Sequence, residues 1–322
     1  MDEDCWTCKF LDQYDEALSG ADQILFQNLH SPVVASLGIA MTLALLFSTQ
    51  IRVQLKTFAP EVSRSDWFLE FYSNSGRLIA ATVALSSYSF WHTWVVGTIN
   101  VLIGTVARAV IGATTMGDTT WEFGGVFFSG DHAAEDQFRV MMAAVYDKTY
   151  APIGTLLEAF AATKFGLTNM AGQFMFSMNI YTMSFAAALS NLSFFIILVM
   201  HKTMTVFVIG LGPLILALWV FKKTQPYAYS LVRFLLATGS VVIGASFLVG
   251  MGLSVINSSL KGAPIFYDDN VPKIALNQLN DWVFSSQFVG MIGAYFALVI
   301  FMIIAVVVGV ATVLAQRPQL EK

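Results

Sequence analysis

Residues 285–314 read SSQFVGMIGAYFALVIFMIIAVVVGVATVL, and this stretch decides the class of fold. It contains no charged residue, and its middle, residues 296–310, is solidly apolar. A helix that crosses a bilayer needs about 20 mostly apolar residues, and this stretch exceeds that length. A barrel strand would alternate apolar and polar side chains over about ten positions. The stretch therefore predicts a transmembrane α-helix.

The same character continues upstream, with apolar segments at residues 174–200, 203–221 and 231–256. Residues 31–51 form one further predicted span, and residues 78–112 are too long for one upright helix and barely long enough for two. Mean hydropathy is +0.67 and 12% of the 322 residues are charged, whereas soluble domains carry about 25%. We predict an all-α fold, a polytopic transmembrane helical bundle of about five to seven spans.

The N-terminal 30 residues are acidic, with seven acids and one base, and lack the basic start of a cleavable signal peptide. Apolar residues recur every three or four positions over residues 9–29, which predicts an amphipathic helix. Its acidic polar face favours packing against protein over anionic lipid. The side chains expected to bind a partner are Phe10, Tyr14, Leu18 and Leu25.

Lysine and arginine in short loops predict the orientation. Residues 1–30 are placed outside as a helix, residues 31–112 hold the first transmembrane segments with a cytoplasmic loop at 52–77, and residues 113–173 form a central polar loop, placed outside. Residues 174–316 form a C-terminal transmembrane bundle, followed by a cytoplasmic tail at 317–322. The parity of crossings stays open: either 78–112 crosses twice, which would bring the central loop inside, or 174–200 or 203–221 crosses incompletely.

The most specific motif is VIGLGPLILALWVFKKTQP at residues 208–226. Proline removes a helical hydrogen bond, and glycines let another backbone or helix approach closely. The motif predicts a structural helix break at Gly210, Gly212 and Pro213. The residues alone favour the alternative of an ordinary kinked transmembrane helix.

These residues also resemble a known family. Leu211-Gly212-Pro213-Leu214, followed by Phe221, Lys222, Thr224 and Pro226 and then a glycine-rich span at 231–256, is similar to the TrbL family, which contains the polytopic inner-membrane component of type IV secretion systems, the sixth protein of the VirB set. The layout is similar over most of the chain, including a cysteine-containing start before an amphipathic helix and the first span. The specific match covers about residues 205–255.

The resemblance implies a non-enzymatic homo-oligomeric subunit in a bacterial inner membrane that supports conjugation, pilus biogenesis and DNA or protein translocation. It implies contacts with a minor and a major pilin, bitopic envelope scaffold subunits, a motor ATPase, membrane lipids and a transient DNA or protein substrate.

Cys5 and Cys8 form a Cys-Trp-Thr-Cys sequence and are the chain's two cysteines. A possible disulfide in an oxidising compartment or two free thiols are both compatible with the sequence. A redox pair is less favoured because no thioredoxin-like unit is present, and a metal site because about four ligands are needed.

Small residues recur at the spacing of helix-packing faces. The residues concerned are Ser240, Gly244, Gly250, Gly293, Ala297, Ala305 and Gly309. Such faces pack within one chain or between subunits. Five ionisable residues lie near membrane depth: His92, Arg108, His201, Lys202 and Arg233. We interpret His201-Lys202 as a tight loop between two spans and the others as interfacial or snorkelling residues.

No phosphate-binding loop, zinc-protease motif or nucleophile elbow occurs, so we predict no catalytic, cofactor-binding or metal site. The alternative function is a small-solute membrane transporter or channel, with irregular helices lining a pore. The missing acids within the spans and the missing internal repeat count against it. A structural subunit of another membrane complex is the third possibility.

Overall fold

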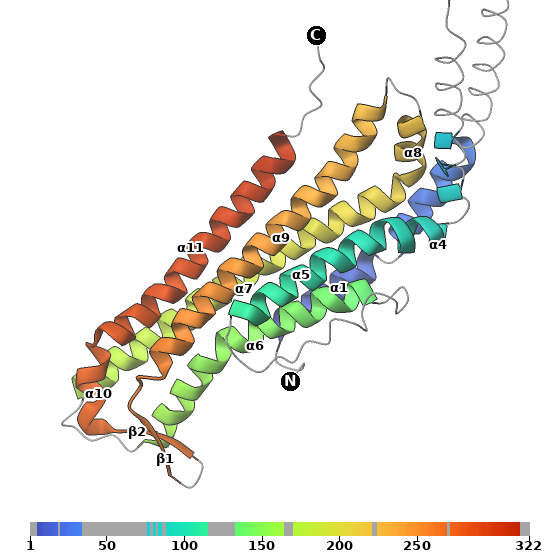
Figure 1. The fold of residues 1–322 in the computed structure, drawn as a ribbon. Helices are drawn as coiled ribbons and strands as arrows, with labels where there is room; N and C mark the ends of the chain where they lie inside the picture. The colour runs from blue at the N-terminus through green and yellow to red at the C-terminus, as the bar shows by residue number, and fades with distance from the viewer. Residues whose placement is uncertain are drawn as a thin grey trace, which may run out of the picture. The chain divides into compact units, whose positions relative to one another are not determined.

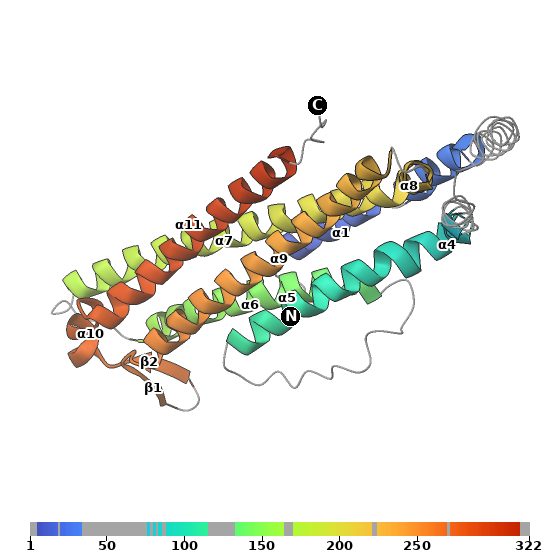
Figure 2. The same ribbon diagram turned by 45° about the horizontal axis from the view of Figure 1, so that its top comes forward.

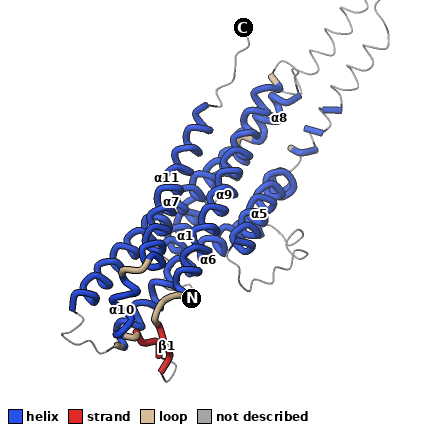
Figure 3. The backbone as a smooth tube through the Cα atoms, turned by 60° about the vertical axis from the view of Figure 1, so that its left-hand side comes forward, coloured by secondary structure: helices blue, strands red, loops and turns tan. Residues whose placement is uncertain are grey.

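The computed structural model describes residues 5–18, 20–33, 76–77, 80–81, 83–85, 88–114, 133–163, 170–220, 224–268 and 271–315. These ranges are almost wholly helical, apart from one two-stranded hairpin (Figure 3). Four described helices are long and apolar enough to cross a membrane: Tyr88–Ile111, Met170–Gly210, Gln225–Leu260 and Ser286–Ala311. The predicted polytopic helical bundle is therefore confirmed. Most of the predicted span 31–51, most of the loop 52–77 and the tail 317–322 lie outside the described residues.

The elements follow one another as α1 (Trp6–Leu18), α4 (Tyr88–Phe90), the π-helix η1 (Trp91–Gly97), α5 (Thr98–Thr114), α6 (Ala133–Ala162), α7 (Met170–Gly210), α8 (Gly212–Val220), α9 (Gln225–Leu260), β1 (Ile265–Asp268), β2 (Val271–Ile274), α10 (Leu276–Val283) and α11 (Ser286–Ala315). Residues 21–33 are also helical. The chain forms two compact units: the first contains Met1–Glu16, Asn100–His201 and Ala237–Leu314, and the second Ala17–Ile99, Lys202–Leu236 and Ala315–Lys322.

In the first unit, α7, α9 and α11 run side by side (Figures 1 and 2). Phe176 of α7 stacks on Phe288 near the start of α11, and Gly309 near the end of α11 lies against Met200 of α7. These two helices are therefore parallel. Gly309 of α11 also lies against Val241 of α9, whereas Gly252, later in α9, lies against Leu298, earlier in α11. Helix α9 therefore runs antiparallel to both α7 and α11. The buried side chains of the unit are mostly apolar, as the hydrophobic effect requires.

A short antiparallel hairpin, β1–β2, and α10 connect α9 to α11 in the first unit. Ile265 pairs with Ile274, whose backbone N–H donates to Thr163 Oγ1 at the end of α6 (2.9 Å). Leu279, Trp282 and Val283 are the buried face of α10. This connection lies between the apolar segments at 231–256 and 285–314.

The central region 113–173, expected to be a polar loop, contains the 30-residue helix α6. The region contains seven acids and three bases, but its apolar residues recur with helical spacing and form a stripe along α6. The buried apolar members of that stripe are Phe138, Met141, Met142, Val145, Ile153, Leu156 and Ala159, and the polar Thr149 is buried among them. The helix continues through Pro152.

The expected N-terminal helix at 9–29 is interrupted at Gly20, whose φ of +80° ends the first helix before a second begins at residue 21. Glycine adopts this left-handed conformation without the steric cost of a Cβ. Leu11, Asp22 and Phe26 are buried, whereas Phe10 is 54% exposed.

The boundary expected at His201-Lys202 between two spans is absent from the structure. A single 41-residue helix, α7, runs from Met170 through these residues to Gly210. The side chain of His201 is fully buried and that of Lys202 nearly so, so the tight-loop interpretation is wrong. The long segment 78–112 supplies one candidate span, beginning at Tyr88.

Candidate functional site at the α7–α8 break

The predicted helix break lies in the second unit, where α7 ends at Gly210, Leu211 forms a turn, and α8 begins at Gly212. The N–H of Leu211 donates to the carbonyl of Phe207, and the N–H of Ile215 to that of Leu211, both at 2.9 Å. Pro213 stands in the first turn of α8 and lacks an N–H. Proline is well tolerated in a first turn, so the break is a new helix start.

Both glycines of the break are in close contact with other helices of the second unit. A Cβ on Gly210 would lie 2.6 Å from Cδ2 of Leu25, in the helix over residues 21–33. A Cβ on Gly212 would overlap the Nε1 atom of Trp91, the first residue of η1. Every larger residue therefore requires its neighbour to move, which gives these two glycines a steric role.

The segment opposite Gly212 is itself irregular. Residues Trp91–Gly97 form a π-helix, in which hydrogen bonds join residues five apart. A Cβ on Gly97 would lie 2.9 Å from the carbonyl oxygen of His92, five residues earlier. Two irregular helical segments thus meet where Trp91 covers Gly212. The Trp91 indole is buried, and among the residues that the structure describes its Nε1 atom has no hydrogen-bond acceptor.

An apolar core surrounds this meeting point. Its buried members come from the N-terminal helix, the segments before and within η1, the end of α7, α8 and the start of α9. They are Phe26, Ala81, Leu85, Trp91, Val96, Val208, Ile209, Ile215, Leu216, Val220, Ala228 and Leu235. Irregular backbone at membrane depth survives only where protein or water satisfies it, and here protein packs around it.

A polar and aromatic cluster borders that core. The Tyr88 hydroxyl donates to Oδ2 of the buried Asp22 (2.6 Å), whose Oδ1 accepts the N–H of Gln23 (2.8 Å). Tyr88 also stacks on His92, with ring centroids 5.3 Å apart, and packs edge-on against Phe26. This cluster fixes the helix over residues 21–33 against the start of the span that begins at Tyr88.

His30 makes a second polar contact in the same region. Its Nε2 atom lies 2.8 Å from the carbonyl oxygen of Leu85, at a turn in the chain before η1. Because a carbonyl only accepts, Nε2 carries the proton. The imidazole also stacks on Phe26. His30 thereby satisfies a backbone acceptor where regular helix is interrupted.

The later part of the motif closes α8. The Thr224 hydroxyl donates to the carbonyl oxygen of Leu218 in the last turn of α8 (2.7 Å), which satisfies one of the acceptors a helix end leaves open. Pro226 stands in the first turn of α9, where its missing N–H costs nothing. Phe221 and Lys222 lie outside the described residues.

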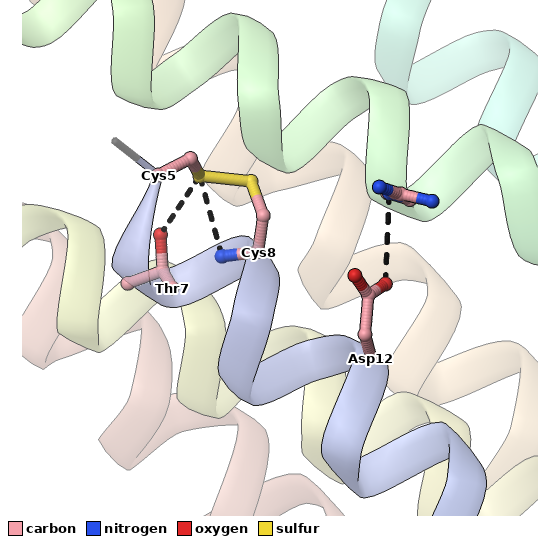
Figure 4. The surroundings of a disulfide bond; sticks show 5 residues. Cys5, Thr7, Cys8 and Asp12 are labelled. Atoms are coloured by element: carbon pink, nitrogen blue, oxygen red, sulfur yellow. Dashed lines mark hydrogen bonds and ion pairs between the residues drawn. A yellow bond between two sulfur atoms is a disulfide. The ribbon is translucent and has the colours of Figure 1, made fainter. Parts of the chain in front are cut away.

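The two cysteines lie in the first unit and are joined by a disulfide (Figure 4). Cys5 directly precedes α1, and the N–H of Cys8 lies 3.2 Å from its sulfur. Both sulfur-bearing side chains are buried. One helical turn further on, Asp12 forms an ion pair with Arg139 of α6 at 3.5 Å. The start of α1 is thus attached to α6.

Aromatic residues continue this attachment along α6. Trp6 donates a side-chain hydrogen bond to Tyr150, whose ring lies 4.6 Å from that of Tyr146. Burial, and then the neighbouring Tyr146, raises the pKa of Tyr150, while the Trp6 hydrogen bond acts in the opposite direction. Burial lowers the pKa of Lys148 on the same helix. Neither residue lies in one of the four candidate spans.

The remaining partner-binding candidates are distributed over both units. Phe10 is exposed on α1, whereas Tyr14, Leu18 and Leu25 are half-buried. Leu25 is therefore used inside the chain, against Gly210. Only Phe10 of this set presents most of its side chain to the surroundings.

The predicted packing residues fall into two groups. Gly250 and Gly309 are buried, and Ala297 and Ala305 are half-buried. Ser240, Gly244 and Gly293 are exposed, and a Cβ on either of these two glycines would meet nothing within 4 Å. Glycines outside the predicted set make closer contacts in the first unit, among them Gly239 against Ile103 and Gly252 against Leu298.

Sequence reasoning missed three features. The position of Trp91 opposite Gly212 leaves no local signal, because the two residues are 121 positions apart. The Asp22–Tyr88 pair is equally non-local. His201 left a signal that was misread: apolar residues continue with helical spacing on both sides of it, and its Nδ1 atom lies 3.0 Å from Thr238 Oγ1 of α9.

The described residues contain no group of three or more histidine, cysteine, aspartate or glutamate side chains that could hold a metal ion. Comparison with known proteins adds no further assignment: no protein-family model matches the chain, and no curated protein matches it.

Proposed function

We propose that this chain is a non-enzymatic inner-membrane platform subunit of a type IV secretion system, supporting pilus assembly and forming part of the route for DNA or protein. In this proposal it is homo-oligomeric, with its N-terminus outside and its C-terminus in the cytoplasm. Its partners are pilins, bitopic scaffold subunits and a motor ATPase, and it needs no cofactor.

One observation carries the proposal: the residues that resemble the TrbL motif share one structural task. Gly212 makes room for Trp91, Pro213 starts α8, and Thr224 closes it. The spacing of these residues matches a short helix between two breaks, so the motif has a structural role. A structural role, and not a catalytic one, is what the proposed platform subunit needs. The polytopic fold supports the same conclusion.

The disulfide provides independent support for the orientation. Disulfides persist in oxidising compartments such as the bacterial periplasm and are rare in the cytosol. Cys5 and Cys8 are bonded at the start of α1, upstream of all four candidate spans. An extracytoplasmic N-terminus is therefore the chemically consistent placement.

The test combines pull-down with two matched glycine variants in the native host. Purification of the tagged chain in mild detergent should recover a motor ATPase, bitopic subunits and a pilin. Gly212→Ala should reduce that recovery and the transfer of substrate, because its Cβ would overlap Trp91. Gly290→Ala, outside the predicted packing set and with a Cβ that meets nothing within 4 Å, should leave both at the wild-type level.

Immunoblots of isolated membranes separate loss of partners from loss of the protein itself. Recovery of the chain alone, with solute flux in liposomes, would replace the proposal by the transporter alternative. Wild-type substrate transfer by Gly212→Ala at normal membrane levels would remove the role assigned to the break.

A further inference from the structure

We propose that the β1–β2 hairpin is a membrane-surface anchor, whose aromatic side chains lie in the lipid head-group region beside the bundle. This inference rests on the membrane-spanning helices of the first unit and is independent of the secretion assignment. It assigns a partner, the lipid surface, to a segment that the proposed function leaves unused.

The place of the hairpin in the chain brings it close to the bilayer. It connects two candidate spans, α9 and α11. Val255 of α9 and Val289 of α11 still expose apolar side chains near these ends. From Val255 to Leu260, the end of α9, the rise is about 7 Å, and the head-group region adds roughly 5–8 Å on each side of the hydrocarbon. We therefore place the start of the hairpin, at Ile265, in the head-group region.

The direction of the hairpin keeps it at that depth. In both ribbon views the strands run across the axis of α9 and not along it (Figures 1 and 2). A hairpin that continued along the helix axis would carry its residues into water. One turned across the axis extends over the bilayer surface.

The exposed side chains of the hairpin suit this environment. Tyr267 is 68% exposed and Phe266 is 47% exposed, and Val271 on the second strand is also exposed. Neighbouring strand residues point to opposite faces, so Phe266 and Tyr267 cannot both be covered by the bundle. Tyrosine is enriched at membrane interfaces because its ring is apolar and its hydroxyl is polar.

The charges favour a neutral rather than an anionic lipid surface. Lys273 of the hairpin is paired with Asp268 at 2.6 Å, so its charge is locally balanced. The polar face of α10 nearby carries exposed Asn277, Gln278 and Asp281, which suits water. The hairpin and α10 therefore differ in chemistry although they are adjacent in the chain.

The disulfide makes a clean experiment possible, because a single introduced cysteine is the only reduced thiol. Tyr267→Cys, Gln278→Cys as aqueous reference and Val307→Cys as membrane reference, exposed on α11, are each labelled with bimane. The full-length protein is then reconstituted in phosphatidylcholine vesicles. Quenching is measured with head-group-labelled nitroxide lipid, with acyl-chain nitroxide lipid and with aqueous iodide.

The expected result is that the label at residue 267 is quenched several-fold more by the head-group nitroxide than the label at 278, and is shielded from iodide. The label at 307 should respond chiefly to the acyl-chain nitroxide. Equal lipid quenching at 267 and 278, with both labels open to iodide, would overturn the proposal and identify the hairpin as a water-exposed surface. Shielding of 267 from both lipid and iodide quenchers would also overturn it, in favour of a protein contact.

Discussion

Gly212 lies directly against the indole of Trp91, so that a Cβ at this position would overlap Nε1 and come within 2.7 Å of Cε2. The contact joins the start of α8 to the start of a π-helix. One segment begins a new helix at Gly212 and the other is a π-helix that begins at Trp91, and each is covered by the other. This pair and the neighbouring Gly210–Leu25 contact make the break sensitive to volume, which can be measured.

The Gly210–Leu25 contact should show energetic coupling. Gly210→Ala is expected to cost about 1–3 kcal/mol of stability, the usual range for overpacking, because its Cβ would lie 2.6 Å from Leu25 Cδ2. In a Leu25→Ala background this cost should shrink. Thermal unfolding of the four proteins in detergent, treated as a double-mutant cycle, measures the coupling. Strictly additive effects would contradict the contact.

Removal of the Tyr88 hydroxyl should destabilise the second unit. Tyr88→Phe leaves the buried Asp22 carboxylate without its 2.6 Å hydrogen bond, and the loss of a partner to a buried acceptor costs about 1–3 kcal/mol. Tyr181→Phe is the matched control, since Tyr181 is among the most exposed aromatic side chains of the described chain. It should change the free energy of unfolding by less than about 0.5 kcal/mol. Similar melting temperatures for both variants would refute this account.

His201 should depend on Thr238 in the first unit. Thr238→Val removes the hydroxyl that lies 3.0 Å from His201 Nδ1 while preserving the shape of the side chain. We expect a loss of about 1–3 kcal/mol, because both groups are buried. Thr238→Ser retains the hydroxyl and should recover most of the loss in the same unfolding assay. Failure of serine to do better than valine would show that shape, not the hydrogen bond, matters there.

Tyr150 should ionise above the ordinary value of 10.0, because burial raises its pKa. The folded state then favours the neutral phenol, so this group's contribution to stability is complete below about pH 10 and is lost as pH rises through the raised pKa. Burial lowers the pKa of Lys148, so the contribution of this group to stability has the opposite dependence and increases as pH rises through the alkaline range.

Comparison of tyrosinate absorbance between the wild type and Tyr150→Phe isolates the titration of this residue. Trp6→Phe removes the hydrogen bond that favours the phenolate and should raise the pKa of Tyr150 further. A downward shift on that substitution would exclude the Trp6 hydrogen bond as a cause.

The long apolar runs were sufficient to predict the membrane bundle, because a run such as residues 285–314 has one stable environment. They were insufficient to locate the ends of the individual helices. His201-Lys202 resembles a loop because charge is costly in lipid, yet a partner on α9 and burial allow the helix to continue through it. The break between α7 and α8, at Gly210 and Gly212, was predicted from the conformational properties of glycine and proline.

The site was predictable only where its causes are local. The Gly-x-Gly-Pro sequence marks the position of a kink or break in a helix, but nothing near Gly212 specifies Trp91 as its neighbour. A helical N-terminal segment was correctly expected, but neither its interruption at Gly20 nor the burial of Leu11 and Phe26 was. Leu11 and Phe26 share the three-to-four-residue spacing of Phe10 and Leu25, so periodicity alone fits both faces.

The length of α7 has a consequence for the bilayer itself. Its 41 residues extend about 62 Å at 1.5 Å per residue, roughly twice the thickness of the hydrocarbon core. The hydroxyls of Thr182 and Ser184 donate to carbonyls one turn earlier in the same helix, at 2.8 and 2.9 Å. Because both hydroxyls are hydrogen-bonded within α7 itself, that part of the helix can lie in water or in lipid. A bilayer surface can therefore cross α7 at Thr182 or Ser184 without leaving either of these two hydroxyls unsatisfied.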